Sequence, residues 1–146
     1  MYHSPHIEFI LMSSTVVKIN HVNKRQQRVL AITNMHVLNI ASPTSLLPNR
    51  IKRRISLNQI LGLTTSRFGN EIVIHIDKED DYRFFTHNLK NKYIEVIVAA
   101  ISRVLHEPTK IYYYDDLSLE QFTTTIVDID KKIRKTPKCA PVMVDQ

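Results

Sequence analysis

Between residues 15 and 86 the chain is a succession of short apolar segments, each separated from the next by polar or turn-forming residues. Within each segment β-branched and large apolar side chains recur over five to seven positions, a pattern typical of strands rather than helices. Two prolines in the stretch 41–49 mark a loop, because proline cannot take part in the interior of a sheet. We expect seven strands, at residues 15–20, 27–33, 36–40, 52–57, 60–66, 71–76 and 82–86.

The hydrophobic period changes after residue 86 from that of a strand to that of a helix. Apolar residues recur at helical spacing between Leu89 and Val104, which predicts one amphipathic helix over residues 89–105. Asn88 is a candidate N-cap, and Pro108 lies just beyond the predicted end. Seven short strands followed by one helix predict an α+β fold, in which a curled antiparallel sheet or barrel is closed by the C-terminal helix.

The remaining segments lie outside this pattern. We expect an N-terminal arm at residues 1–13, a domain at residues 14–106 and a C-terminal extension at residues 107–146. In the extension, apolar side chains at helical spacing predict a second helix over residues 119–135, with Ser118 and Gln121 in the positions of a capping box. Protein partners are expected for the N-terminal arm and for residues 109–146.

The composition argues against several classes of function. The 146 residues include only two glycines, so neither the phosphate loop nor the dinucleotide-binding fingerprint is encoded. The single cysteine, Cys139, lies in a proline-bounded tail where no rigid scaffold orients a base against it. The seven histidines are scattered, and the acidic run at residues 77–81 lacks the ligand spacing of a calcium loop. We therefore expect no enzyme activity, no cofactor and no metal site.

Charge and hydropathy indicate where the chain acts and on what. No apolar run approaches the roughly 20 residues of a membrane-spanning helix, and the N-terminal residues lack the features of a secretion signal. A lone cysteine fits a reducing compartment, so we expect a cytoplasmic protein. The net charge of +6 favours anionic partners. Nucleic acid is not expected among them, because the strands offer no ordered aromatic platform between the cations.

Three stretches, taken in order, carry a family resemblance: VVKINHVNKRQQRVLAITNMHVLNI, KRRISLNQILGLTTSRFGNEIVIHI and YRFFTHNLKNKYIEVI. The most specific pieces are the basic hairpin leading into RVLAIT, the KRRISL step and SRFGNEIVIH. Over residues 14–105 the chain resembles the tail homology domain of class I myosins, a divergent pleckstrin-homology-like module. The resemblance implies a non-catalytic binding module at the membrane or the cytoskeleton, expected here as a free-standing module without a motor.

In that family the loop between the first two strands carries a phosphoinositide-binding signature, a basic residue followed after a gap by two more with one residue between them. Lys18, Arg25 and Arg28 lie on the matching stretch with Lys24 beside them, and the final step is one residue longer here. The resemblance therefore implies that these four side chains bind lipid phosphates. Ammonium and guanidinium groups from two adjacent strands can converge on a multiply charged head group. The alternative is a solvated hairpin without a ligand.

A second basic cluster, made of Arg50, Lys52, Arg53 and Arg54, alternates in part with isoleucines. It either extends an anionic docking face or protects an edge strand from aggregation. The function that we expect is docking on an anionic surface, with phosphoinositide or other anionic lipid head groups bound by the first hairpin. The alternative is a structural subunit of a large cytoskeletal assembly, axonemal or microtubule-associated, in which the fold docks on an acidic protein surface.

Overall fold

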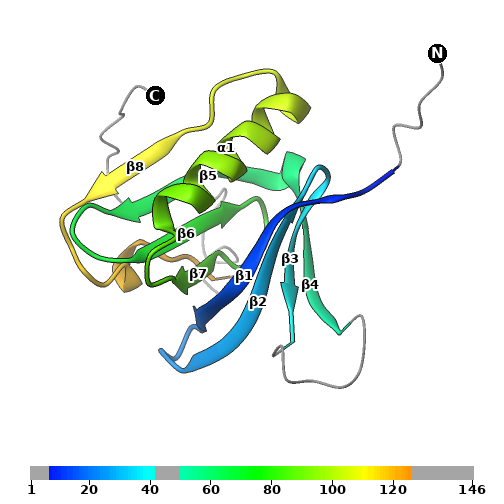
Figure 1. The fold of residues 1–146 in the computed structure, drawn as a ribbon. Coiled ribbons are helices and arrows are strands. Elements are labelled where there is room, and N and C mark those ends of the chain that lie inside the picture. Colours follow the sequence, from blue (N-terminus) through cyan, green and yellow to red (C-terminus); the bar gives the residue numbers. More distant parts are fainter. Residues whose placement is uncertain (1–6, 42–49, 126–146) are drawn as a thin grey trace, which may run out of the picture.

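The structure is a computed structural model that describes residues 7–41 and 50–125 (Figure 1). The described residues form eight strands, one α-helix and two 3-10 turns. The strands are β1 (Ile10–Ile19), β2 (Arg25–Thr33), β3 (His36–Ile40), β4 (Ile51–Ser56), β5 (Ile60–Ser66), β6 (Glu71–Ile76), β7 (Tyr82–Phe85) and β8 (Ile111–Tyr114). The helix is α1 (Lys90–Leu105), and the 3-10 turns are η1 (Leu57–Gln59) and η2 (Glu120–Phe122).

All eight strands belong to one sheet in the order β4-β3-β2-β1-β7-β6-β5-β8. Neighbouring strands are antiparallel except β5 and β8, which run parallel. The sheet is therefore mixed and open, with β4 and β8 as its edges. We expected seven antiparallel strands in a curled sheet or barrel closed by the C-terminal helix; the structure instead has eight strands, β8 runs parallel to its neighbour, and the sheet itself does not close into a barrel. Strand β8 escaped prediction because three consecutive tyrosines show no alternation of apolar and polar residues.

Helix α1 packs against one face of the bent sheet, as Figure 1 shows. We call this face, which carries the core residues, the inner face. The buried side chains of α1 join one core cluster with apolar residues from both halves of the sheet, among them Leu30, Ile32, Leu63 and Ile74. The helix expected at residues 89–105 is thus present. Its N-cap is Leu89 rather than Asn88, and no side chain caps it by a hydrogen bond.

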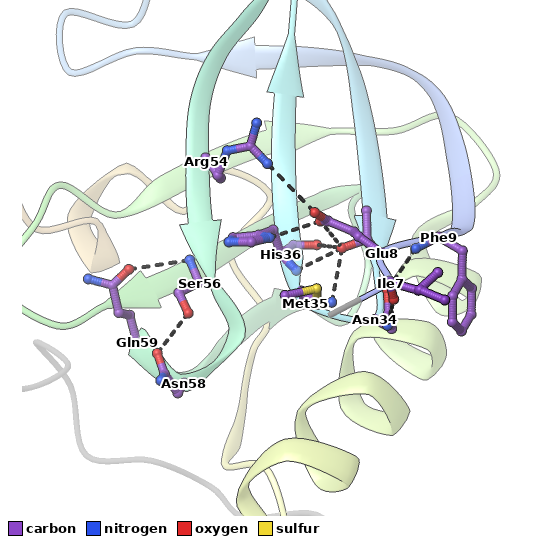
Figure 2. A network of polar contacts seen from close by, with 11 residues as sticks. Ile7, Glu8, Phe9, Asn34, Met35, His36, Arg54, Ser56, Asn58 and Gln59 are labelled. Atoms are coloured by element: carbon purple, nitrogen blue, oxygen red, sulfur yellow. Dashed lines mark hydrogen bonds and ion pairs between the residues drawn. The ribbon is translucent and has the colours of Figure 1, made fainter. Parts of the chain in front are cut away.

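Part of the expected N-terminal arm is ordered: residues 10–13 belong to the sheet, and residues 7–9 are hydrogen-bonded beside it. Strand β1 begins at Ile10, so residues 10–13 already pair with the end of β2. Ahead of it, the Asn34 side-chain amide donates to the carbonyl of Ile7 at 2.9 Å, and the backbone N–H of Phe9 donates to Asn34 Oδ1 at 2.8 Å. These bonds fasten residues 7–9 to the turn between β2 and β3 (Figure 2).

The first part of the expected C-terminal extension also packs on the sheet. Leu119 and Phe122 are buried against Val73, and the Phe122 ring stacks on Tyr114 with centroids 4.2 Å apart. Of the second helix expected at residues 119–135, residues 119–125 form the 3-10 turn η2 and no α-helix, which is a correction. Residues 126–135 lie outside the described residues. Within the described part of the chain, no helix is long and apolar enough to cross a membrane.

Candidate anion-binding site

Strand register places Lys18 and Arg28 on the inner face of the sheet. In the β1–β2 ladder Val16 lies opposite Arg28 and Lys18 lies opposite Gln26. Paired residues share a face, and so do alternate residues along a strand, so all four belong to one face. Val16 is 2% exposed and part of the core. The two cations therefore continue the core-facing row of side chains beyond the point where the apolar core ends.

Arg53 from β4 lies on the same face. In the ladders Leu30 pairs with Asn39 and Asn39 pairs with Arg53, which carries the inner face from β2 across β3 to β4. The side chain of Arg53 is 21% exposed. The register thus adds to Lys18 and Arg28 a cation that the sequence had placed in the second basic cluster.

Tyr82 of β7 lies under this group of cations. Its ring centroid is 5.9 Å from Lys18 Nζ, and its hydroxyl donates to Asn39 Oδ1 at 2.8 Å. Tyr82 itself is fully buried. An aromatic ring beneath an ammonium group favours the positive charge, so Tyr82 supports Lys18 where the apolar core gives way to the cations.

The basic side chains act on one another electrostatically. Burial lowers the pKa of Lys18 below its ordinary value, and the charges of Arg28, Arg53 and Lys52 lower it further, while Asp80 opposes the shift. The Nε of Arg28 is buried and has no hydrogen-bond partner among the described residues. An anion bound to this half-buried cluster would lower the free energy of the protein, because it would offset the repulsion between the cations and accept a hydrogen bond from the unused donor.

The loop between β6 and β7, residues 77–81, borders this cluster with acidic groups. Arg53 Nη2 donates to the backbone carbonyl of Asp80 at 2.5 Å and lies 3.4 Å from Glu79 Oε1. A cavity of about 60 Å³ lies between the loop and the strands, and Lys18, Arg53, Asp80 and Thr123 are among its lining residues. The acidic run is therefore not a separate solvated turn but one wall of the basic site.

The four residues of the expected lipid site are not all brought together. Arg25 lies opposite Ile19 on the outer face, where its guanidinium carbon is 5.8 Å from the centroid of Phe85. Lys24 is exposed in the turn between β1 and β2. The inner-face position between Lys18 and Arg28 belongs to Gln26, so a neutral amide stands next to the two cations.

The second basic cluster is divided between the two faces of β4. Arg53 points inward, whereas Lys52 and Arg54 alternate with it and are exposed. Arg54 Nη1 lies 3.7 Å from Glu8 Oε1, and Figure 2 shows this pair beside the hydrogen bond from His36 to the same carboxylate. Thr33 also donates a hydrogen bond to Glu8. Arg54 is therefore partly neutralised within the chain.

The β1–β2 turn is tied to the C-terminal extension. Asn23, which has a positive φ of 63°, donates from its side-chain amide to Glu120 Oε2 at 2.7 Å. Arg83 donates to Asn23 Oδ1 at 2.8 Å and to Ser118 Oγ at 3.0 Å, and it forms a buried ion pair with Glu71 at 2.8 Å. These bonds fix the backbone of the turn that carries Lys24, and the sequence pattern gave no sign of them.

One buried polar chain has the residue types of a catalytic triad. Thr64 Oγ1 and His75 Nε2 are 2.5 Å apart, and His75 Nδ1 lies 2.9 Å from Asp81 Oδ2. Each of the three residues is at most 8% exposed, and Asp81 also accepts the backbone N–H of Thr124 at 2.9 Å. Because these three residues are buried, a substrate has no access to them. Their hydrogen bonds join β5, β6 and the extension. In the described ranges no group of His, Cys, Asp or Glu side chains has the geometry of a metal site.

The architecture defines the class of protein. A solved pleckstrin homology domain matches this chain with a TM-score of 0.54 at 17% identity, covering 66% of this chain and 89% of that one. The PH domain of human oxysterol binding protein-related protein 11 matches with a TM-score of 0.54 at 9% identity, covering 68% and 84%. The hSac2 domain from human phosphoinositide phosphatase Sac2 matches with a TM-score of 0.53 at 10% identity, covering 76% and 80%. The chain is a pleckstrin-homology-like domain.

The family is given by the sequence. Residues 3–137 match the family described as unconventional myosin tail, actin- and lipid-binding, so the chain belongs to that family. The resemblance seen in the three sequence stretches is thereby confirmed, and the family is one of binding modules. The match also extends beyond residue 106, in keeping with the packing of β8 and η2 on the sheet. Among curated proteins none matches this chain.

Proposed function

We propose that this chain docks on membranes by binding the phosphates of phosphoinositide or other anionic lipid head groups at the inner-face cations Lys18 and Arg28. The observation that carries the proposal is the register that places both side chains on one face beyond the apolar core, where Arg28 Nε is buried without an acceptor among the described residues. The family description, which includes lipid binding, supports it independently.

The energetics favour a multiply charged ligand. Burial and then the charge of Arg28 lower the pKa of Lys18, and a head-group phosphate near Lys18 offsets both effects. Each cation close to an anionic membrane contributes on the order of 1 kcal/mol, and Lys24, exposed in the adjacent turn, adds to this attraction. The cavity of about 60 Å³ is too small to enclose a sugar ring, so the head group binds at its mouth.

The test compares two double variants with the same loss of charge. Phosphatidylcholine vesicles containing a phosphatidylinositol bisphosphate are titrated with the wild type, with Lys18→Gln/Arg28→Gln, and with Lys92→Gln/Arg103→Gln, which alters two exposed positions on α1. We expect the first variant to lose at least about ten-fold in affinity, given about 1 kcal/mol for each cation. The α1 variant should lose much less. Equal losses would show that net charge alone drives binding.

A second candidate is contact with an actin filament, because the family description also includes actin binding. Peripheral association with membrane or cytoskeleton in the cytoplasm follows from either activity. Co-sedimentation with actin filaments tests the candidate directly, and pelleting that depends on filament concentration supports it. The wider alternative, a structural subunit of an axonemal or microtubule assembly, stays a proposal whose test is co-sedimentation with microtubules.

A further inference from the structure

The acidic loop holds one of the inner-face cations in an intramolecular contact. Glu79 Oε1 lies 3.4 Å from Arg53 Nη2, and the second carboxylate oxygen of Glu79 accepts a hydrogen bond of 3.2 Å from Gln59 Nε2. The side chains of Arg53 and Glu79 are 21% and 42% exposed, and Arg53 lines the small cavity, so the pair lies near the surface beside the site rather than in the core. The contact is accordingly weak enough for a ligand to replace.

The loop also supplies negative charge to the rest of the cluster. Burial and then the charges of Arg28, Arg53 and Lys52 lower the pKa of Lys18, and Asp80 is the group that opposes this shift. An anion that enters therefore meets cations that are already partly compensated. It must offer more negative charge than a single carboxylate to exchange places with Glu79.

We propose that Arg53 is a third phosphate-binding cation of the site and that Glu79 is a competing internal anion that restricts Arg53 to polyphosphorylated ligands. The inference rests on the proposed lipid-binding function and concerns the same site. A lipid with one negative charge leaves Arg53 with Glu79, because it offers no more charge than the carboxylate does. A head group with several phosphates recruits Arg53, since guanidinium and phosphate form short, paired hydrogen bonds.

A double-mutant cycle tests the competition. Vesicles of phosphatidylcholine with a phosphatidylinositol bisphosphate are titrated with the wild type, Glu79→Gln, Arg53→Gln and the double variant. Glu79→Gln should raise the affinity for these vesicles about two- to five-fold, because it removes an exposed ion pair that competes for Arg53. Arg53→Gln should weaken binding, and in its presence Glu79→Gln should have no further effect, because the two residues act through each other.

The matched control is Glu95→Gln on α1, which removes the same charge from a side chain 74% exposed and 3.5 Å from Lys92. It should leave the affinity nearly unchanged. Glutamine at position 79 keeps an acceptor for Gln59, and Arg53→Lys, which keeps the charge, guards against a loss of fold in Arg53→Gln. On phosphatidylserine vesicles of equal surface charge, Arg53→Gln should cost less than about two-fold.

Each result supports or overturns the inference. A gain from Glu79→Gln that equals that from Glu95→Gln, or that persists with Arg53→Gln, overturns the competition. If Arg53→Gln loses the same affinity for phosphatidylserine vesicles as for vesicles with a phosphatidylinositol bisphosphate, the proposed selectivity for polyphosphorylated ligands is overturned. If the wild type binds no vesicles, or if Lys18→Gln/Arg28→Gln binds as the wild type does, the proposed function itself fails and takes the inference with it. If Lys18→Gln/Arg28→Gln weakens binding but the effects of Glu79→Gln and Arg53→Gln simply add, the proposed function stands and only the inference about Arg53 and Glu79 is overturned.

Discussion

At the residue scale, strand parity decides which basic side chains work together. Lys18 and Arg28 share the inner face, whereas Arg25 is three residues before Arg28 and therefore lies on the other face, over Phe85. The position that shares the face between them is Gln26. The chain thus has the basic residues of the family signature that the resemblance implies, but not their spacing: the inner-face position two residues before Arg28 is the neutral Gln26.

The first prediction follows from this parity. Gln26→Lys should raise the affinity for vesicles that contain a phosphatidylinositol bisphosphate by about five-fold, because it adds one inner-face cation worth about 1 kcal/mol. Arg25→Gln should weaken binding far less than Arg28→Gln, since Arg25 faces away from the site. Vesicle titration measures both. An Arg25→Gln loss as large as that of Arg28→Gln would mean that the outer face binds the lipid.

A second prediction concerns Glu8. Burial alone raises its pKa, but hydrogen bonds from Thr33 and His36 and the charges of His36 and Arg54 outweigh burial, so its pKa lies below the ordinary value of 4.5. A carboxyl group with a lowered pKa stabilises the fold at pH values above its ordinary pKa. That stabilisation is lost as the pH falls through the folded-state pKa. Glu8→Gln should therefore be less stable than the wild type near neutrality, by about 1 kcal/mol or less.

The measurement is the midpoint of thermal unfolding against pH for both proteins. The difference between wild type and Glu8→Gln should shrink as the pH falls below about 4.5 and should vanish in stronger acid. A difference that stays constant into acid would show that the ionisation of Glu8 does not stabilise the folded state.

At the scale of elements, β8 depends on a close approach of two backbones. A Cβ atom at Gly62 would lie 2.8 Å from the carbonyl oxygen of Lys110, the same oxygen that accepts the backbone N–H of Leu63 at 2.9 Å. Only glycine allows β8 to enter the sheet at this distance from β5. The parallel pairing of residues 111–114 with β5 thus requires glycine at position 62 of β5.

The prediction for this element is that Gly62→Ala lowers the free energy of unfolding by roughly 1–3 kcal/mol, a typical cost of overpacking. Urea denaturation measures the total, and hydrogen exchange locates it. The amides of Leu63 and Arg67, which donate to Lys110 and Tyr114, should lose protection before those of β1 and β2. Unchanged protection of these two amides would contradict the proposed role of Gly62.

The elements also show how far sequence reasoning reaches. The strands at residues 36–40, 60–66 and 71–76 were predicted at their observed bounds, because each is a compact apolar segment between clear turns. Strand β8 and the packing of Leu119 on Val73 were not, since they depend on contacts between distant segments. The same holds for the inner-face cations: the sequence singled out Lys18 and Arg28 as candidates, but only the register shows that Arg25 faces outward and that Arg53 faces inward.

At the scale of the whole molecule, one continuous inner face carries both the apolar core and the cations of the proposed binding site. Tyr93 of α1 covers the part of the face around Ser14 and Leu30 with hydrogen bonds of 2.6 and 2.8 Å. Further along the same two strands the face changes from apolar residues to Lys18 and Arg28. The acidic loop and the extension line the same small cavity as Lys18 and Arg53, so the proposed site is built from segments far apart in the sequence.

The measurement that tests this account most directly is an NMR titration of the isotopically labelled chain with inositol trisphosphate. Soluble head group removes the membrane from the experiment and reports the binding face itself. The account predicts the largest shifts at Lys18, Gln26, Arg28 and Arg53, from strands β1, β2 and β4. Shifts confined to Arg25 on the outer face, or to α1, would contradict it.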